Sequence, residues 1–159
     1  MVYVGTFSKV LFPALRIGYL PLPQALVAPF LEVRRLIDVH GPVLEQAALA
    51  DFIAEGHFAR HLRRMRVLYT ERRAVLLEAA AGLPLEIDSP PAGIHCIGWL
   101  PEGTEARDFA RCALEAGLQL TPVSDFSIEP PEREGALLGY GGFNEADIRT
   151  ALSKLAEIF

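Results

Sequence analysis

The alternation of apolar and polar positions over residues 1–56 predicts two short strands followed by two helices. Runs rich in β-branched and aromatic residues at 2–4 and 17–20 end at glycine or proline, as strands often do. Apolar residues then recur at helical spacing over 24–38, and a Gly-Pro pair separates this run from a second helical run at 43–56. Two strands are too few to form a sheet of their own, so this part differs in kind from the rest of the chain.

From residue 57 onward the pattern predicts a self-contained α+β layer. The predicted elements, in order, are a long helix at 57–82, strands at 85–89 and 94–100, a helix from an N-cap at Thr104 to Gly117, strands at 118–123 and 136–141, and a closing helix capped by Asn144. This order favours a small, mainly antiparallel sheet covered by helices. The predicted fold class is therefore α/β, with residues 1–56 and 57–159 as separate parts.

Composition and charge exclude several classes of protein. Of the 159 residues 51% are hydrophobic and 22% are charged, which is typical of a folded globular protein. A net charge of −5 gives no whole-chain reason to expect nucleic acid or a membrane as partner. The sequence has no apolar run long enough for a bilayer and no signal-peptide pattern at its start, so a cytoplasmic location is the default expectation. Cys96 and Cys112 lack metal-ligand spacing and are expected to be buried, reduced thiols.

The stretch "GTFSKVLFPALRIGYL" near the start carries the most distinctive chemistry. Lys9 supplies a primary amine, Thr6 and Ser8 supply hydroxyls, and Arg16 supplies a rigid fork of donors. A pyridoxal-phosphate protein requires an amine that bonds to the aldehyde of the cofactor, and nearby groups that hold its phosphate. On residue types alone, a surface loop with solvated charges explains the same letters.

The resemblance of a longer stretch to a known family distinguishes these two interpretations. "GTFSKVLFPALRIGYL", "QAALADFIAEGHFARHLRRMRVLYTERR", "AGIHCIGWL" and "ALLGYGGFNEADI" occur in the order found in fold-type-I pyridoxal-phosphate-dependent aminotransferases. The chain most closely resembles the aminotransferase-like domain of the MocR branch of GntR-type bacterial transcriptional regulators. The resemblance implies that 1–56 is a remnant of the cofactor-binding large domain and that 57–159 is the C-terminal small domain.

The resemblance also implies roles for individual residues. Lys9 would bond to the aldehyde of pyridoxal 5'-phosphate and later move a proton, while Thr6, Ser8 and Arg16 would hold the phosphate. Aminotransferases of this fold usually carry an arginine for the substrate carboxylate where this sequence has Leu137. Leucine cannot pair with a carboxylate, so the departure favours sensing of a ligand over its turnover.

Three further residues are candidates for the substrate or effector, each with a structural alternative. Arg133 could replace the absent arginine, or it could be a solvated loop residue. By the resemblance, His95, on the turn into a predicted strand, would approach the substrate pocket, and His40, before a helix break, could reach the active site of a partner subunit. The structural alternatives are a hydrogen-bonded structural histidine at 95 and an exposed histidine at 40.

The basic helix at 57–82 carries two further candidate patterns. His57 and His61 are four residues apart, a metal-binding spacing, but no third ligand is near, and no metal site is predicted. The six arginines between residues 60 and 73 are expected to spread around the solvent side of the helix and to pair with acidic residues elsewhere, or with the missing large domain, rather than with nucleic acid.

Together these inferences predict the pyridoxal-phosphate-binding part of a regulator or of an aminotransferase. In the full protein it would form a homodimer, recognise an amino acid or amine, and meet DNA only through an N-terminal domain. Groups that face the cofactor ring would lie before residue 1, so we expect the gene product to continue upstream and this chain alone to be inactive. The alternatives are a catalytic aminotransferase without a regulator domain, and a stand-alone α+β interaction or dimerisation module without cofactor.

Overall fold

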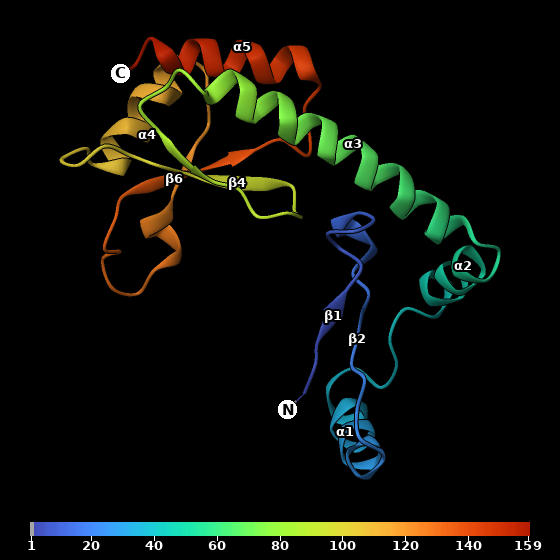
Figure 1. Cartoon of the computed structure of the whole chain (residues 1–159). Coiled ribbons are helices and arrows are strands. Elements are labelled where there is room, and N and C mark those ends of the chain that lie inside the picture. Colours follow the sequence, from blue (N-terminus) through green and yellow to red (C-terminus); the bar gives the residue numbers. More distant parts are fainter. Residues whose placement is uncertain (1) are drawn as a thin grey trace. The chain divides into compact units, whose positions relative to one another are not determined.

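The computed structural model describes residues 2–159, which divide into two units (Figure 1). The first unit ends at Arg64, and the second comprises Met65–Phe159, so the division lies inside the long helix α3. The elements are β1 (Gly5–Thr6), the 3₁₀ helix η1 (Pro13–Leu15), β2 (Gly18–Tyr19), α1 (Gln24–Ile37), α2 (Val43–Ala54), α3 (His57–Ala80), β3 (Glu86–Asp88), β4 (His95–Trp99), α4 (Ala106–Glu115), β5 (Thr121–Pro122), the 3₁₀ helix η2 (Val123–Phe126), β6 (Gly135–Gly139) and α5 (Glu145–Ala156).

The first unit begins with an antiparallel hairpin of β1 and β2. Gly5 pairs with Tyr19 and Thr6 with Gly18, and the Phe7 amide donates to the Ile17 carbonyl at 3.1 Å. The strand predicted at 2–4 is wrong, because pairing begins only at Gly5. Beyond Tyr19 the partner strand reaches Pro21, which has no amide hydrogen to extend the ladder.

The two helices of the first unit lie where the apolar spacing predicts them. α1 ends at the Arg34–Asp38 ion pair, with Nε and Oδ1 3.5 Å apart. Both helices leave much of their apolar surface in solvent: Leu36 is 88% exposed and Leu44 is 83% exposed. Within residues 2–64 only Gly5 and Leu49 are buried, so this unit has almost no core of its own.

The second unit contains a four-stranded antiparallel sheet in the order β3-β4-β6-β5. The long central pairing aligns Cys96 with Leu138 and Ile97 with Leu137. Within this unit α3, α4 and α5 cover one face of the sheet, as Figure 1 shows above β4 and β6. The prediction of a small antiparallel sheet covered by helices is confirmed, although the strand predicted at 118–123 is reduced to the two residues of β5.

The core of the second unit lies between the sheet and its helices. Alternate strand residues point into it, so Leu138 is 4% exposed while its neighbour Leu137 is half-buried on the other face. The helices contribute the other layer of the core. The buried residues of the whole core are Val75, Leu76, Cys96, Leu100, Ala106, Phe109, Ala113, Leu138, Tyr140, Ile148 and Leu155.

Helix ends are fixed by local hydrogen bonds, only some of which the sequence predicts. Asn144 caps α5 as predicted, its side-chain oxygen accepting from the Asp147 amide at 2.9 Å. Thr104 is not the cap of α4, because the helix begins one residue later, after Glu105, without a side-chain cap bond. α4 ends at Glu115, and Gly117, with a φ of 81°, turns the chain so that the Leu118 amide donates back to the Ala113 carbonyl at 2.8 Å.

The prediction that both cysteines are buried is wrong for Cys112. Cys112 is exposed, because the buried stripe of α4 runs through Phe109 and Ala113 and places residue 112 beside it. The ion pairs within residues 2–159 do not include the six arginines between residues 60 and 73, so the expected pairing with acidic residues of this chain is not found. Arg72 and Arg73 instead donate to the Gly141 carbonyl (2.6 Å) and to both oxygens of Ser89 (2.6 and 2.8 Å). The alternative, pairing with the absent part of the large domain, stays a prediction.

Each helix in residues 2–159 is too short or too polar to cross a lipid bilayer.

Candidate functional site

The loop after β1, residues 7–11, carries Lys9 and is called the lysine loop below. It is closed by the Leu11 amide, which donates to the Phe7 carbonyl at 2.8 Å. Before the loop, the Thr6 hydroxyl donates to Ser8 Oγ at 3.1 Å and accepts from the Ser8 amide at 3.2 Å. These bonds hold the two hydroxyls side by side, while Lys9 lies exposed in the turn that follows.

Arg16 lies at the far end of the same hairpin, just after η1. Its φ of 51° and ψ of 33° place it in the left-handed region, which residues with a Cβ seldom adopt. Its amide donates to the Pro13 carbonyl at 3.4 Å, and two residues later Gly18 enters the ladder opposite Thr6. The turn therefore returns the chain so that Arg16 and the Thr6–Ser8 hydroxyls belong to one hairpin.

The start of α3 supports the lysine loop from outside the hairpin. The Phe7 ring packs against the edge of Phe58, with centroids 5.7 Å apart and planes at 67°. His61 Nε2–H donates to the Val10 carbonyl at 2.9 Å. Phe7 also contacts Tyr19 of β2, with a centroid distance of 5.5 Å. The loop is thus held on both sides of Lys9.

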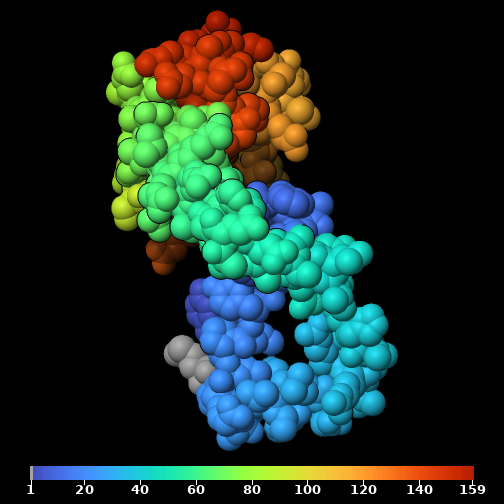
Figure 2. Space-filling model, turned by 90° about the vertical axis from the view of Figure 1, so that its right-hand side faces the viewer, coloured from blue at the N-terminus to red at the C-terminus, as the bar shows by residue number. Residues whose placement is uncertain are grey.

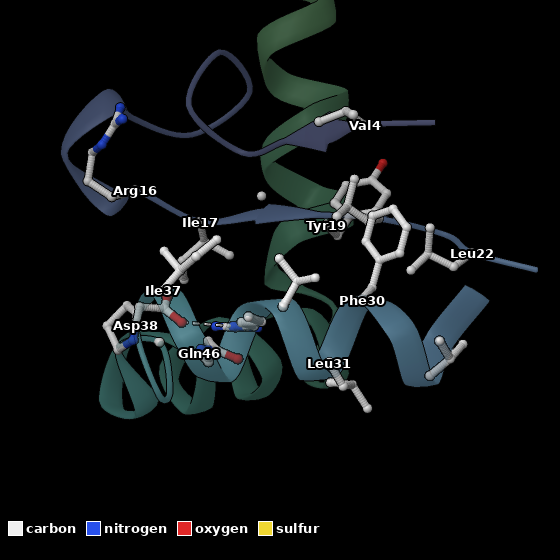
Figure 3. Close-up of a pocket in the computed structure, with 17 residues that line it drawn as sticks. Val4, Arg16, Ile17, Tyr19, Leu22, Phe30, Leu31, Ile37, Asp38 and Gln46 are labelled. Atoms are coloured by element: carbon white, nitrogen blue, oxygen red, sulfur yellow. Dashed lines mark ion pairs between the residues drawn. The ribbon is translucent and has the colours of Figure 1, made fainter. Parts of the chain in front are cut away.

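A cavity of about 750 Å³ lies between β2 and α1 in the first unit. The space-filling view shows this unit hollowed beside the segments coloured blue to cyan (Figure 2). Its lining is mainly apolar, and Figure 3 shows Tyr19 and Phe30 facing the same space, with the Arg34–Asp38 ion pair at the other end. Of the four residues predicted to hold the cofactor, Arg16 alone contributes to this lining.

The donor set of the hairpin fits the chemistry of pyridoxal phosphate. The phosphate needs hydroxyl, amide or guanidinium donors, and the adjacent hydroxyls of Thr6 and Ser8 together with Arg16 supply them. The aldehyde needs a primary amine, and Lys9 supplies one from an exposed turn next to those hydroxyls. The residue types of the hairpin therefore fit the predicted cofactor, and their convergence on one ligand stays a prediction.

The remaining predicted residues lie apart from this hairpin. His40 is exposed between α1 and α2, follows Val39 with its φ of 55°, and contacts the Gly41 carbonyl through Nδ1 at 3.1 Å. In the second unit His95 is exposed at the start of β4, opposite Gly139. Arg133 is engaged by Glu86 at 2.6 Å and lies 5.3 Å from the Trp99 ring centroid. The hydrogen bond from its guanidinium lowers the pKa of Glu86. The roles of these residues stay predictions.

Sequence reasoning missed the residues that support the lysine loop. Phe58 and His61 are three residues apart on α3, so they project from the same side of the helix. By sequence spacing alone His61 and His57 form a possible metal-binding pair. In the structure His57 Nε2 instead lies 3.1 Å from Glu55 Oε2. The hydrogen bond from His61 to Val10 joins two residues that are 51 positions apart in the sequence. Local sequence patterns do not indicate contacts between residues so far apart.

Comparison with known proteins finds relatives along the whole chain. No family model matches it. It is 38% identical to "Probable rhizopine catabolism regulatory protein MocR" of Rhizobium meliloti, over 100% of this chain and 33% of that protein. It is 37% identical to the HTH-type transcriptional regulator YhdI of Bacillus subtilis, over 98% of this chain and 34% of that protein.

A solved structure extends the comparison to enzymes. LysN, an α-aminoadipate aminotransferase of Thermus thermophilus crystallised with N-(5'-phosphopyridoxyl)-L-leucine, matches with a TM-score of 0.88 and 26% identity over 99% of this chain and 41% of that chain. The chain is homologous, over its whole length, to a segment shared by MocR-type regulators and fold-type-I aminotransferases. This confirms the predicted resemblance and fold class. The aminotransferase-like segment spans about a third of the length of the curated relatives it matches.

Proposed function

We propose that the full protein binds pyridoxal 5'-phosphate through the β1–β2 hairpin and uses it to sense an amino acid or another amine. The observation that carries this proposal is the hairpin, in which Lys9 follows the Thr6–Ser8 hydroxyl pair and Arg16 closes the return turn. Homology to aminotransferases, one of them solved with a phosphopyridoxyl ligand, supports the same cofactor.

Each residue of the hairpin has a definite task in this proposal. Thr6, Ser8 and Arg16 hold the phosphate by charge-assisted hydrogen bonds, which fixes the orientation of the whole cofactor. Lys9 would be the residue that bonds covalently to the aldehyde of the cofactor, and when its amine is free it could hold or move a proton. The bound cofactor supplies an aldehyde and a ring that can accept electrons from a neighbouring carbon.

Leu137 favours sensing over transamination. It lies in the middle of β6 with Ile97 and Thr121 as its ladder partners, and its side chain is on the face opposite the core. An aliphatic side chain there cannot pair with a carboxylate, and the nearby Arg133 is engaged by Glu86. The proposal therefore keeps recognition of an effector amine, while the arginine that the resemblance would place here to orient an amino acid for turnover is absent.

The regulator relatives suggest the partners of the full protein. We propose that it acts as a homodimer in the cytoplasm and meets DNA through a domain outside this chain, as an HTH-type regulator would. The net charge of −5 gives this segment no electrostatic attraction for DNA phosphates.

Borohydride trapping tests the proposed cofactor site. The full-length protein is incubated with pyridoxal phosphate and reduced, and its peptides are analysed by mass spectrometry. We expect the cofactor to be fixed on the Lys9 peptide, to be lost in Lys9→Ala, and to be retained about 10-fold more weakly in Arg16→Ala, because one charge-assisted contact to the phosphate is removed. Lys154→Ala is the matched control, since Lys154 donates to the Ala116 carbonyl in the other unit.

Two outcomes would contradict the proposal. A protein that stays unmodified and self-associates through its aminotransferase-like segment would support the alternative of an interaction module without cofactor. Rapid conversion of amino donors by the full-length protein would contradict the sensing function and would show that the protein is a catalytic aminotransferase.

A further inference from the structure

The lysine loop is short and its own bonds fix it only partly. The Leu11-to-Phe7 bond closes the turn, but Lys9 and Val10 lie exposed at its tip. A primary amine that must meet an aldehyde at one place loses rate and affinity if its backbone is free to move. The position of Lys9 therefore depends on what holds the loop from outside.

Two side chains from the first turns of α3 do so. Phe58 packs edge-on against Phe7, two residues before Lys9. His61 donates from Nε2 to the Val10 carbonyl at 2.9 Å, one residue after Lys9. Because both project from one side of α3, the helix acts as a rigid support for the loop.

The two contacts differ in what they can specify. The aromatic contact is apolar and tolerates sliding of the rings. The hydrogen bond is directional and joins one atom of α3 to the Val10 carbonyl, so it fixes the Val10–Leu11 peptide, one residue after the lysine.

We propose that His61 is a positioning residue for Lys9, acting through the Val10 carbonyl to hold the lysine loop in the conformation that presents the amine to the cofactor aldehyde. This inference rests on the proposed function, since it assigns His61 a task in cofactor capture. It also makes a claim about the loop itself that is independent of any cofactor.

The matched variants follow from the side chains present. His61→Leu keeps bulk and removes the donor. His61→Gln offers an amide N–H that can reach the same carbonyl, because the glutamine amide nitrogen lies about as far along the side chain as Nε2. His57→Leu is the control on the same helix, since His57 contacts Glu55 (3.1 Å) and stacks on Phe52 (centroids 5.6 Å apart).

The first readout is cofactor affinity of the full-length protein, titrated with pyridoxal phosphate and followed by borohydride fixation on Lys9. His61→Leu should weaken binding about 3- to 10-fold, as expected for one lost hydrogen bond. His61→Gln and His57→Leu should stay within about twofold of the unmodified sequence. Melting temperatures of the cofactor-free proteins identify any variant whose loss comes from unfolding.

The second readout needs no cofactor. Trypsin cleaves after lysine, so its rate at Lys9–Val10 reports how often the loop leaves its support. Cleavage should be about 3- to 10-fold faster in His61→Leu and near the original rate in His61→Gln.

The outcomes separate the two proposals. Equal cleavage and equal affinity in His61→Leu and the unmodified protein would overturn the role of His61, as would equal losses in His61→Leu and His57→Leu. Failure to fix any cofactor on Lys9 of the unmodified protein would overturn the proposed function instead, and the trypsin rates would still decide whether His61 holds the loop.

Discussion

The two cysteines illustrate how the environment of a single residue decides its chemistry. Cys96 is 2% exposed in β4, and its thiol is beside the Leu138 carbonyl at 3.9 Å. Burial raises the pKa of the Cys96 thiol to about 11, because the thiolate would lose its hydration. Cys112 lies on the solvent side of α4.

We therefore predict selective alkylation of Cys112. With iodoacetamide near pH 8 the folded protein should take up one equivalent at Cys112, while Cys96 reacts only after denaturation, because the thiolate is the nucleophile. Peptide mass spectrometry identifies the modified residue, and Cys112→Ser should leave the folded protein unlabelled. Rapid labelling of Cys96 without denaturant would contradict the buried position of β4.

Arg133 and Glu86 show the same principle on the surface. Their hydrogen bond, 2.6 Å long, lowers the pKa of Glu86 and raises the pKa of Arg133. A carboxyl group whose folded pKa is lowered stabilises the fold above its unfolded pKa, and this contribution is lost as the pH falls through the folded pKa. Both side chains are largely exposed, so the contribution to stability is small.

We predict that Arg133→Ala raises the pKa of Glu86 toward that of an ordinary glutamate. The carboxyl carbon of Glu86, followed by NMR from pH 7 to pH 2, should titrate at higher pH in the variant. Arg111→Ala is the control, because Arg111 pairs with Asp108 on α4. An unchanged titration of Glu86 would show that Arg133 does not bind Glu86 in solution, which would strengthen Arg133 as a candidate for binding the effector.

At the scale of elements, the hairpin β1–β2 depends on two glycines. A Cβ at Gly5 would collide with the Tyr19 ring, and a Cβ at Gly18 would lie 2.9 Å from the Gly5 carbonyl oxygen. The lack of side chains lets the two strands approach while Tyr19 covers the backbone of Gly5. The position of the lysine loop follows from this close pairing.

We predict that Gly5→Ala weakens cofactor capture without affecting the second unit. The added methyl group should displace Tyr19, disturb the hairpin and lower the affinity of the full-length protein for pyridoxal phosphate by about 10-fold or more. Gly142→Ala is the control, because a Cβ there has no atom within 4 Å. Equal affinities in the two variants would show that the hairpin does not determine where Lys9 lies.

The elements also show which parts of the structure can be predicted from the sequence alone. α1, α2 and α3 match their predicted ranges because glycine and proline mark their ends and apolar spacing marks their faces. The strand at 2–4 was predicted wrongly because its residue types suit a strand, whereas pairing depends on Pro21 in the partner. Lys9 and Arg16 could be selected by their chemistry, but the contact of His61 with Val10 depends on tertiary packing across 51 residues.

At the scale of the whole molecule, burial is distributed unevenly between the two units. Residues 2–64 contain two buried residues, Gly5 and Leu49, whereas the second unit has a contiguous core around Leu76 and Leu138. Apolar burial is the main source of stability, so the second unit should account for most of the free energy of unfolding. The first unit, which carries the candidate cofactor site, has little burial to stabilise it.

Amide hydrogen exchange on the 159-residue chain tests this difference. We expect amides of β4 and β6 to exchange only through global unfolding. Amides of α1 and α2 should be protected at least ~100-fold less, because local opening of those helices exposes little apolar surface that is buried in the folded unit. Leu138→Ala should accelerate exchange throughout the second unit, since it leaves a cavity in the core. In α1 and α2, where exchange is already local, the same substitution should change the rates little. Uniform protection across both units would mean that the first unit is stabilised by something other than its own apolar burial.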